Sequence, residues 1–127
     1  MKNFTLLVQE LYSKQREFGY LEAISLFREN CEDSYGSSGY FLQIILSAYP
    51  LDSSDRKLKL NFSGVRNLKI GEIDALVKVL VSIVDISANQ LEDIKYSVKD
   101  DEHDLFSFYC NYFSFEEVII ASDEVSL

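Results

Sequence analysis

The chain has 127 residues, of which 47% are apolar and 26% charged, and it contains a single proline. These values are typical of one globular domain and exclude a chain that is disordered by composition, so we expect residues 1–127 to form a single domain. The net charge of −9 disfavours nucleic acid and anionic membranes as partners and favours basic ones.

The acidic charge is concentrated towards the C-terminus. Residues 1–84 contain ten acidic and ten basic residues, whereas residues 85–127 contain eleven acidic residues and two basic ones, Lys95 and Lys99. Such a field can serve solubility alone or can attract a basic partner, and the sequence leaves both explanations open.

The sequence predicts a cytoplasmic protein without a membrane span. The longest apolar stretch, residues 75–86, is too short to cross a bilayer and is interrupted by charged residues. An apolar beginning that resembles a signal peptide ends at Gln9 and Glu10, before any cleavage site. Cys31 and Cys110 form no CxxC motif, and we predict that both are free thiols.

The first predicted element is a helix over residues 4–17, because apolar residues recur there at helical spacing. Gly19 is expected to cap its C-terminal end. The apolar stripe consists of Phe4, Leu7, Val8, Leu11 and Tyr12.

The next segments favour strands. Residues 22–29 are compatible with helix or strand, and the turn signals and strands that follow favour a strand. Residues 30–39 are polar and rich in glycine and serine, which indicates a loop. Residues 40–49 are aromatic and β-branched, as in a central strand, and Pro50 ends them.

Residues 57–62 are the clearest strand, since leucine and phenylalanine alternate there with lysine and asparagine. Ser63 and Gly64 interrupt this pattern, and residues 65–70 resume it. The strand is therefore expected to bury one face and to expose the other.

The C-terminal half predicts a β-hairpin. Residues 72–79 fit either helix or strand, and the valines and isoleucines up to residue 86 favour a strand there. Residues 93–99 alternate, an acidic turn follows at residues 100–104, and residues 105–115 form a second, aromatic strand. Residues 118–121 are a candidate short strand before a frayed tail.

The aromatic strand has two distinct faces, of which we assign the first to the core and expect a two-layer fold to bury both. The first face consists of Phe106, Phe108, Cys110 and Tyr112, and the second consists of Ser107, Tyr109, Asn111 and Phe113. Together the segments predict an α+β, mostly β fold: an antiparallel sheet or sandwich with an N-terminal helix.

The sequence does not predict an enzyme. His103, the one histidine, lies among acidic residues that favour its charged form, so it is a poor general base. A dyad with Cys110 is disfavoured because Cys110 falls on the core face. No catalytic residue is predicted.

The acidic residues at 100–104 have three interpretations: a solvated loop, a docking loop for a partner, and a hard-cation site. Calcium requires six to eight oxygen ligands, and the spacing and glycine of an EF-hand are missing. Glycine-rich phosphate loops are also absent, and the basic residues between Arg56 and Lys69 are typical of the solvated face of a sheet. No metal, cofactor or nucleic acid is therefore predicted.

Two segments carry a family resemblance. Residues 58–71, LKLNFSGVRNLKIG, and residues 81–113, VSIVDISANQLEDIKYSVKDDEHDLFSFYCNYF, contain the pattern L-x-F-x-G-V, then D-I-S-x-x-Q-x-E, then an aromatic hairpin ending F-x-F-x-C. This pattern resembles small bacterial immunity proteins of polymorphic-toxin and contact-dependent growth-inhibition systems. It covers about half of the chain, and its motifs are structural and of low specificity.

The resemblance implies a non-catalytic protein that binds and neutralises a cognate toxin, which we expect to be basic and nuclease-like. It supplies no site residues, so the candidates come from charge and pattern, with Tyr109 as an aromatic anchor. The predicted partner-binding residues are Asp100, Asp101, Glu102, Asp104, Tyr109, Glu92, Asp93, Glu116 and Glu117.

Two other classes of function remain open from the residues. The chain can be a structural or oligomeric domain of a bacterial assembly that forms a homodimer through an exposed strand edge. An enzyme with a sheet-lined pocket for a small ligand is the least favoured, because no acidic residues are predicted to converge in a cleft.

Overall fold

The computed structural model describes residues 3–28, 40–48, 56–73, 75–89 and 94–119. They form one N-terminal helix and a seven-stranded antiparallel sheet, which confirms the predicted mostly β fold. The elements are α1 (Phe4–Gln15), β1 (Tyr20–Arg28), β2 (Tyr40–Ser47), β3 (Arg56–Ile70), β4 (Val81–Asp85), a 3-10 turn (Ser87–Asn89), β5 (Tyr96–Asp100), β6 (Phe106–Cys110) and β7 (Tyr112–Ile119).

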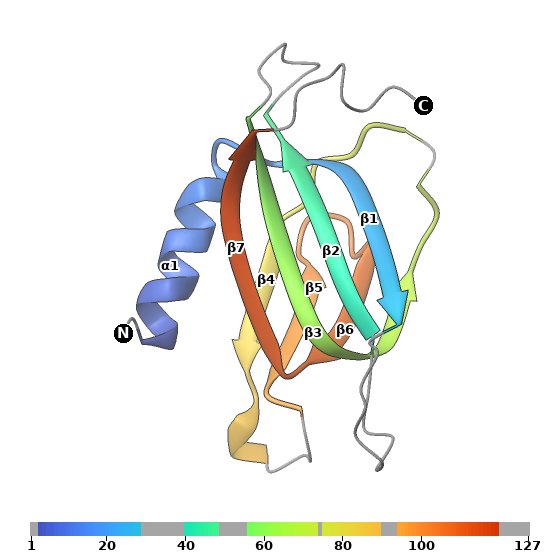
Figure 1. Cartoon of the computed structure of the whole chain (residues 1–127). Helices are drawn as coiled ribbons and strands as arrows, with labels where there is room; N and C mark the ends of the chain where they lie inside the picture. The colour runs from blue at the N-terminus through green and yellow to red at the C-terminus, as the bar shows by residue number, and fades with distance from the viewer. Residues whose placement is uncertain (1–2, 29–39, 49–55, 74, 90–93, 120–127) are drawn as a thin grey trace.

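The sheet is folded into two layers (Figure 1). The strand order is β1-β2-β3-β6-β5-β4, and β7 also pairs with β3. In Figure 1, β1, β2, β3 and β7 form the layer nearer the viewer, and β4, β5 and β6 form the layer behind it. β3 contributes to both layers, because it pairs with β2 and β7 along its first part and with β6 along its last part.

The change of partner along β3 occurs at Gly64. The predicted interruption of the alternation is found here, since Gly64 and Val65 are both buried, but the strand does not end, because β3 continues through Ser63 and Gly64. Gly64 has a positive φ of 67°, a conformation that costs other residues free energy. Before it, Ser63 is paired with Tyr112 of β7, and after it, Arg66 is paired with Tyr109 of β6. The glycine therefore bends the strand without ending it.

The chain that pairs with β3 is also interrupted close to Gly64. Residues 105–115, predicted as one strand, are divided at Asn111 into β6 and β7. The alternation therefore restarts after Asn111: Tyr112, expected on the core face, is 59% exposed, and Phe113, expected on the other face, is 5% exposed. The core face predicted along β6 itself is confirmed, because its two phenylalanines and its cysteine are buried.

The core lies between the layers. Leu58, Leu60 and Phe62 of β3 are at most 1% exposed, which confirms the alternation predicted for residues 57–62. The ring of Phe62 meets the ring of Phe108 edge-on, with centroids 5.0 Å apart. Such pairs contribute about 1 kcal/mol beyond the burial of their area, so this contact holds the two layers together.

The N-terminal helix covers the open side between β7 and β4 (Figure 1). Its predicted apolar stripe is confirmed, since all five residues are buried or packed against the core. The Gln15 side chain accepts a hydrogen bond from the Val81 N–H at 2.7 Å and donates one to the Val81 carbonyl at 2.9 Å. Lys14 forms an ion pair with Glu117 of β7 at 2.9 Å. The helix is thereby joined to both strands.

The predicted cap at Gly19 is wrong. The helix ends at Gln15, and the residue after it, Arg16, is the C-cap and has an ordinary right-handed helical conformation. At the other end of α1, the Asn3 side chain accepts a hydrogen bond from the Leu6 N–H at 2.9 Å. Gly19 instead lies beyond the helix, just before β1.

Residues 72–79 form neither a regular helix nor a strand in their described part. Lys78 makes an isolated antiparallel bridge with Tyr20, and the Leu21 N–H donates to the Val77 carbonyl at 2.9 Å. This stretch therefore lies against the beginning of β1 before the chain enters β4, the strand expected up to residue 86.

Several expectations lie outside the described residues. These are the loop at residues 30–39, the turn after Pro50, the C-terminal tail and Cys31. Cys110 is a buried free thiol. No helix of the described part is long and apolar enough to cross a membrane.

We expect Gly64→Ala to lower the free energy of unfolding by about 2–4 kcal/mol. The positive φ costs an alanine about 1–2 kcal/mol, and its Cβ would lie 2.6 Å from side-chain atoms of Asn111, which adds an overpacking cost. Urea denaturation measures the loss.

Two further variants serve as controls. Adding Asn111→Ala to Gly64→Ala should recover the part of the loss that comes from overpacking. Gly71→Ala, whose Cβ would meet nothing nearer than 3.6 Å, should leave the free energy of unfolding unchanged. Equal losses at Gly64 and Gly71 would contradict the assignment of the bend to Gly64.

Candidate functional site

The acidic turn predicted at residues 100–104 connects β5 to β6 in the rear layer (Figure 1), and because Asp100 is the last residue of β5, the name is used from here on for residues 101–104. It is held by Asp100, the last residue of β5, whose side chain is buried with 1% exposure. Both of its carboxylate oxygens accept hydrogen bonds from backbone N–H groups. The donors are Leu80 (3.0 Å) and Glu102 (2.9 Å) to Oδ1, and His103 (3.2 Å) and Leu105 (3.1 Å) to Oδ2.

Asp100 is therefore a structural residue of the turn, and its carboxylate is not on the surface. The exposed carboxylates of the turn are those of Asp101, Glu102 and Asp104. The Lys99 ammonium lies 3.6 Å from the Asp101 carboxylate, and both side chains are largely exposed. Three carboxylates beside one lysine give the turn a negative surface that is already folded before any partner arrives.

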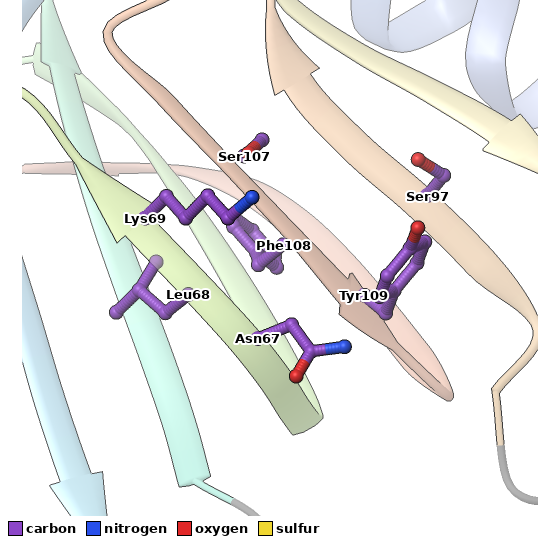
Figure 2. Close-up of a pocket in the computed structure, with 7 residues that line it drawn as sticks. All are labelled: Asn67, Leu68, Lys69, Ser97, Ser107, Phe108 and Tyr109. Atoms are coloured by element: carbon purple, nitrogen blue, oxygen red, sulfur yellow. The ribbon is translucent and has the colours of Figure 1, made fainter.

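Two adjacent hollows form a groove that runs from the acidic turn along β3 and β6. The first hollow, of about 430 Å³, is shown in Figure 2. The second, of about 290 Å³, includes Asp104 in its wall. Lys69 and Ser107 line both, so the two hollows adjoin each other. The first is lined by Asn67, Leu68, Lys69, Ser97, Ser107, Phe108 and Tyr109.

The groove follows from a bulge in β3. Arg66 pairs with Tyr109 and Lys69 pairs with Ser107. Between these two pairs β3 advances by three residues and β6 by two, so β3 contains one extra residue. Asn67, within the extra step, has a positive φ of 57°, which asparagine tolerates better than most residues. The bulge redirects the β3 side chains, and Figure 2 shows Asn67 beside Tyr109 and Lys69 beside Phe108 and Ser107.

The predicted anchor Tyr109 and the predicted acid Asp104 thus lie along one groove. Asp104 is exposed and lies at the end of the groove nearer the acidic turn. Tyr109 is partly exposed and lies at the opposite end of the groove. Ser97, Ser107, Asn67 and Lys69 were not among the predicted site residues. The alternation of the strands places both serines on the outer face, but neither the pairing of β3 with β6 nor the bulge has a signal in the sequence.

Glu116 and Glu117 lie elsewhere, on β7 in the front layer (Figure 1). Glu117 forms ion pairs with Lys14 and with Arg56, each at 2.9 Å. Hydrogen bonds from Lys14 and then Arg56 lower the pKa of the Glu117 carboxyl. Glu116 is exposed and pairs across the sheet with Lys59. The structure does not bring either of them to the acidic turn.

Two predicted partner-binding residues and the two members of the alternative catalytic dyad complete the set of candidates. Glu92 and Asp93 lie outside the described residues. His103 lies in the turn before β6, whereas Cys110 is the last residue of that strand and is fully buried. Burial raises the pKa of the Cys110 thiol to about 12, so the thiol is protonated and unreactive at neutral pH. Within the described ranges, no three His, Cys, Asp or Glu side chains are grouped as metal ligands.

A protein-family model described as Immunity protein PIM8 matches residues 5–116. The match extends from the first turn of α1 into β7, and it includes both the acidic turn and the groove. No curated protein and no solved structure matches the chain.

We expect Asp100→Ala to lower the free energy of unfolding by about 2–4 kcal/mol, because four backbone N–H groups lose a charged acceptor. Asp100→Asn should cost less, since the amide retains one acceptor oxygen. Urea denaturation and amide hydrogen exchange at Leu105 measure both effects. The exposed neighbour Asp101→Asn is the control, and a loss there as large as that of Asp100→Ala would rule out the structural role of Asp100.

We expect the Cys110 thiol, in a Cys31→Ser background, to resist iodoacetamide at pH 8 in the folded protein and to react once urea unfolds it. The folded pKa lies above the unfolded value, so the contribution to stability is complete at neutral pH. It is lost as pH rises above the ordinary thiol pKa of about 8.5, where the unfolded chain ionises first. Mass spectrometry measures the modification. Rapid alkylation of the folded protein at neutral pH would contradict this account.

Proposed function

The chain belongs to the PIM8 family of immunity proteins, and from this premise we propose that it neutralises a cognate bacterial toxin by binding it through an acidic surface. The family match over residues 5–116 carries the proposal. Proteins of this kind are typically non-catalytic, so neutralisation here is binding rather than chemistry.

The acidic turn is the part of the described surface best suited to this role. Its three exposed carboxylates are held on a turn whose backbone is already fixed by Asp100. Little conformational entropy is therefore lost when a partner binds to it. Carboxylates of this kind increase the rate of encounter with a basic protein and weaken encounter with an acidic one.

Two other acids of the described surface, Glu22 and Glu117, are less available. Glu22 is paired with Lys57 at 2.9 Å, and Glu117 is shared between Lys14 and Arg56. Each of these carboxylates lies closer to its cationic partner than Asp101 lies to Lys99, at 3.6 Å, so more of its charge is offset locally. Glu116 is exposed but lies on β7, away from the acidic turn, so of the predicted supporting acids only Glu92 and Asp93, which lie outside the described residues, remain candidates for the proposed surface.

The charge of the acidic turn also indicates which kind of toxin would bind to it. A negative surface fits a basic toxin, as expected of a nuclease whose active-site cleft attracts a polyanion. Tyr109, at the far end of the groove, is suited to anchor it, because tyrosine buries a large area at a small entropy cost. We place the encounter in the bacterial cytoplasm, as part of a contact-dependent growth-inhibition system.

The alternative, an oligomeric interaction domain, has one supporting feature. Among the described strands, β1 has only β2 as a strand partner, and its side chains Leu26 and Phe27 are 47% and 51% exposed. An edge strand with exposed apolar side chains is suited to pairing with a second chain. This feature is compatible with a homodimer and does not account for the family match.

The test begins with co-purification. The tagged chain is expressed together with its neighbouring open reading frames, and we expect a basic toxin domain that is released when the salt concentration is raised. Recovery of the chain alone as a salt-insensitive dimer would favour the oligomeric alternative.

With the toxin in hand, we expect the triple variant Asp101→Lys, Glu102→Lys and Asp104→Lys to weaken its binding about a hundredfold and to abolish protection of growth. The matched control reverses Glu10, Glu17 and Glu22, which changes the net charge equally away from the turn. Calorimetric titration measures both affinities. Unchanged affinity in the first variant, or equal losses in the two, would rule out the acidic turn as the binding surface.

A further inference from the structure

The groove contains a site whose charge is opposite to that of the rest of the proposed surface. We call the first hollow, lined by the seven residues given above, the β3–β6 pocket. Among these described lining residues, Lys69 carries the one formal charge, and the other polar members are an asparagine, two serines and a tyrosine. In a chain of net charge −9, this pocket is positive, beside a turn that is negative.

The polar groups of the pocket come from three strands. Figure 2 shows the side chains of Lys69 and Asn67 from β3, Tyr109 and Ser107 from β6, and Ser97 from β5 around one hollow. An ammonium, an amide and three hydroxyls can all donate hydrogen bonds at the same time. The corresponding ligand is an acceptor with several lone pairs, and hydrogen bonds to a charged acceptor are the stronger ones. A carboxylate meets this description.

The wall of the pocket is fixed before binding. Phe108 is 2% exposed and packs on Phe62 in the core, and Leu68 also packs against the core. The β3 side of the pocket is set by the bulge at Asn67. A volume of about 430 Å³ lies in the usual range of small-ligand sites, so the pocket has room for a single acidic side chain.

The position of the pocket favours a protein carboxylate over a phosphate polymer. The second hollow, which shares Lys69 and Ser107 with the pocket, has Asp104 in its wall. A polyanion that reached Lys69 would also approach the carboxylates of the acidic turn and would be repelled. One acidic side chain in an otherwise basic protein surface avoids this repulsion, because its neighbours are attracted to the turn.

We propose that the β3–β6 pocket receives an aspartate or glutamate side chain of the bound toxin, through Lys69, Asn67 and the hydroxyls around them. The proposal rests on the function proposed above and adds a second contact of opposite sign. A positive site beside a negative one fixes the orientation of the partner and penalises basic toxins that lack the matching acid.

The test asks whether an added negative charge at position 69 strengthens or weakens binding of the toxin. Lys69→Glu makes the chain more acidic, so an interface that depends only on negative charge predicts equal or tighter binding of a basic toxin. The pocket predicts the reverse. We expect Lys69→Met to weaken binding of the purified toxin domain about tenfold, and Lys69→Glu to weaken it about a hundredfold or more. Lys95→Glu, an equal charge change at an exposed lysine outside the pocket, should not weaken it.

Each outcome decides between the proposals. Urea denaturation first establishes that the variants are folded, as expected for substitutions of an exposed side chain. Replacement of the toxin's acidic residues by lysine, one at a time, should then find one that restores binding to Lys69→Glu. If wild type binds the toxin and Lys69→Glu binds equally well, or if no toxin substitution restores binding, the pocket proposal is wrong and the immunity function stands. If wild type binds no toxin, both proposals fail.

Discussion

The left-handed backbone at Gly64 allows one strand to serve two layers, and the rest of the fold depends on it. The Asn111 N–H donates to the Ser63 carbonyl at 3.0 Å, and the Asn111 side chain occupies the space that a Cβ at Gly64 would take. The bend directs β3 away from β7 and onto β6, which places the rings of Phe62 and Phe108 face to edge in the core. Without that change of direction, β4, β5 and β6 would continue the layer formed by β1, β2, β3 and β7. No second layer would then cover the inner face of that sheet.

Folding a sheet in this way leaves backbone groups exposed along its outer strands, and α1 supplies partners for them. The amide of Gln15 is hydrogen-bonded to both the N–H and the carbonyl of Val81, as a neighbouring strand would be. Phe4 stacks on Tyr96 and meets Phe113 edge-on, so the helix contacts the rear and front layers together. The helix therefore completes the core as well as covering it.

The surface charge is less uniform than the net charge suggests. Ion pairs occupy Glu22 and Glu117, and hydrogen bonds within the turn occupy Asp100. Three exposed carboxylates are adjacent in the acidic turn, while Lys69 gives the adjoining groove the opposite sign. A partner that matches both must present charges of both signs in a matching pattern, and such a pattern is more selective than net charge alone.

The sequence by itself determined the apolar stripe of α1, the alternation of β3 around Leu60, the turn between β5 and β6, and the membership of an immunity-protein family. These features are local, because each depends on side-chain periodicity or on neighbouring residues. The tertiary structure alone decided that Asp100 is buried, that Phe113 rather than Tyr112 faces the core, and that Tyr109 lines a groove with Lys69. Each of these results depends on the register between strands distant in sequence, and a bend or a bulge of one residue reverses the faces that periodicity predicts.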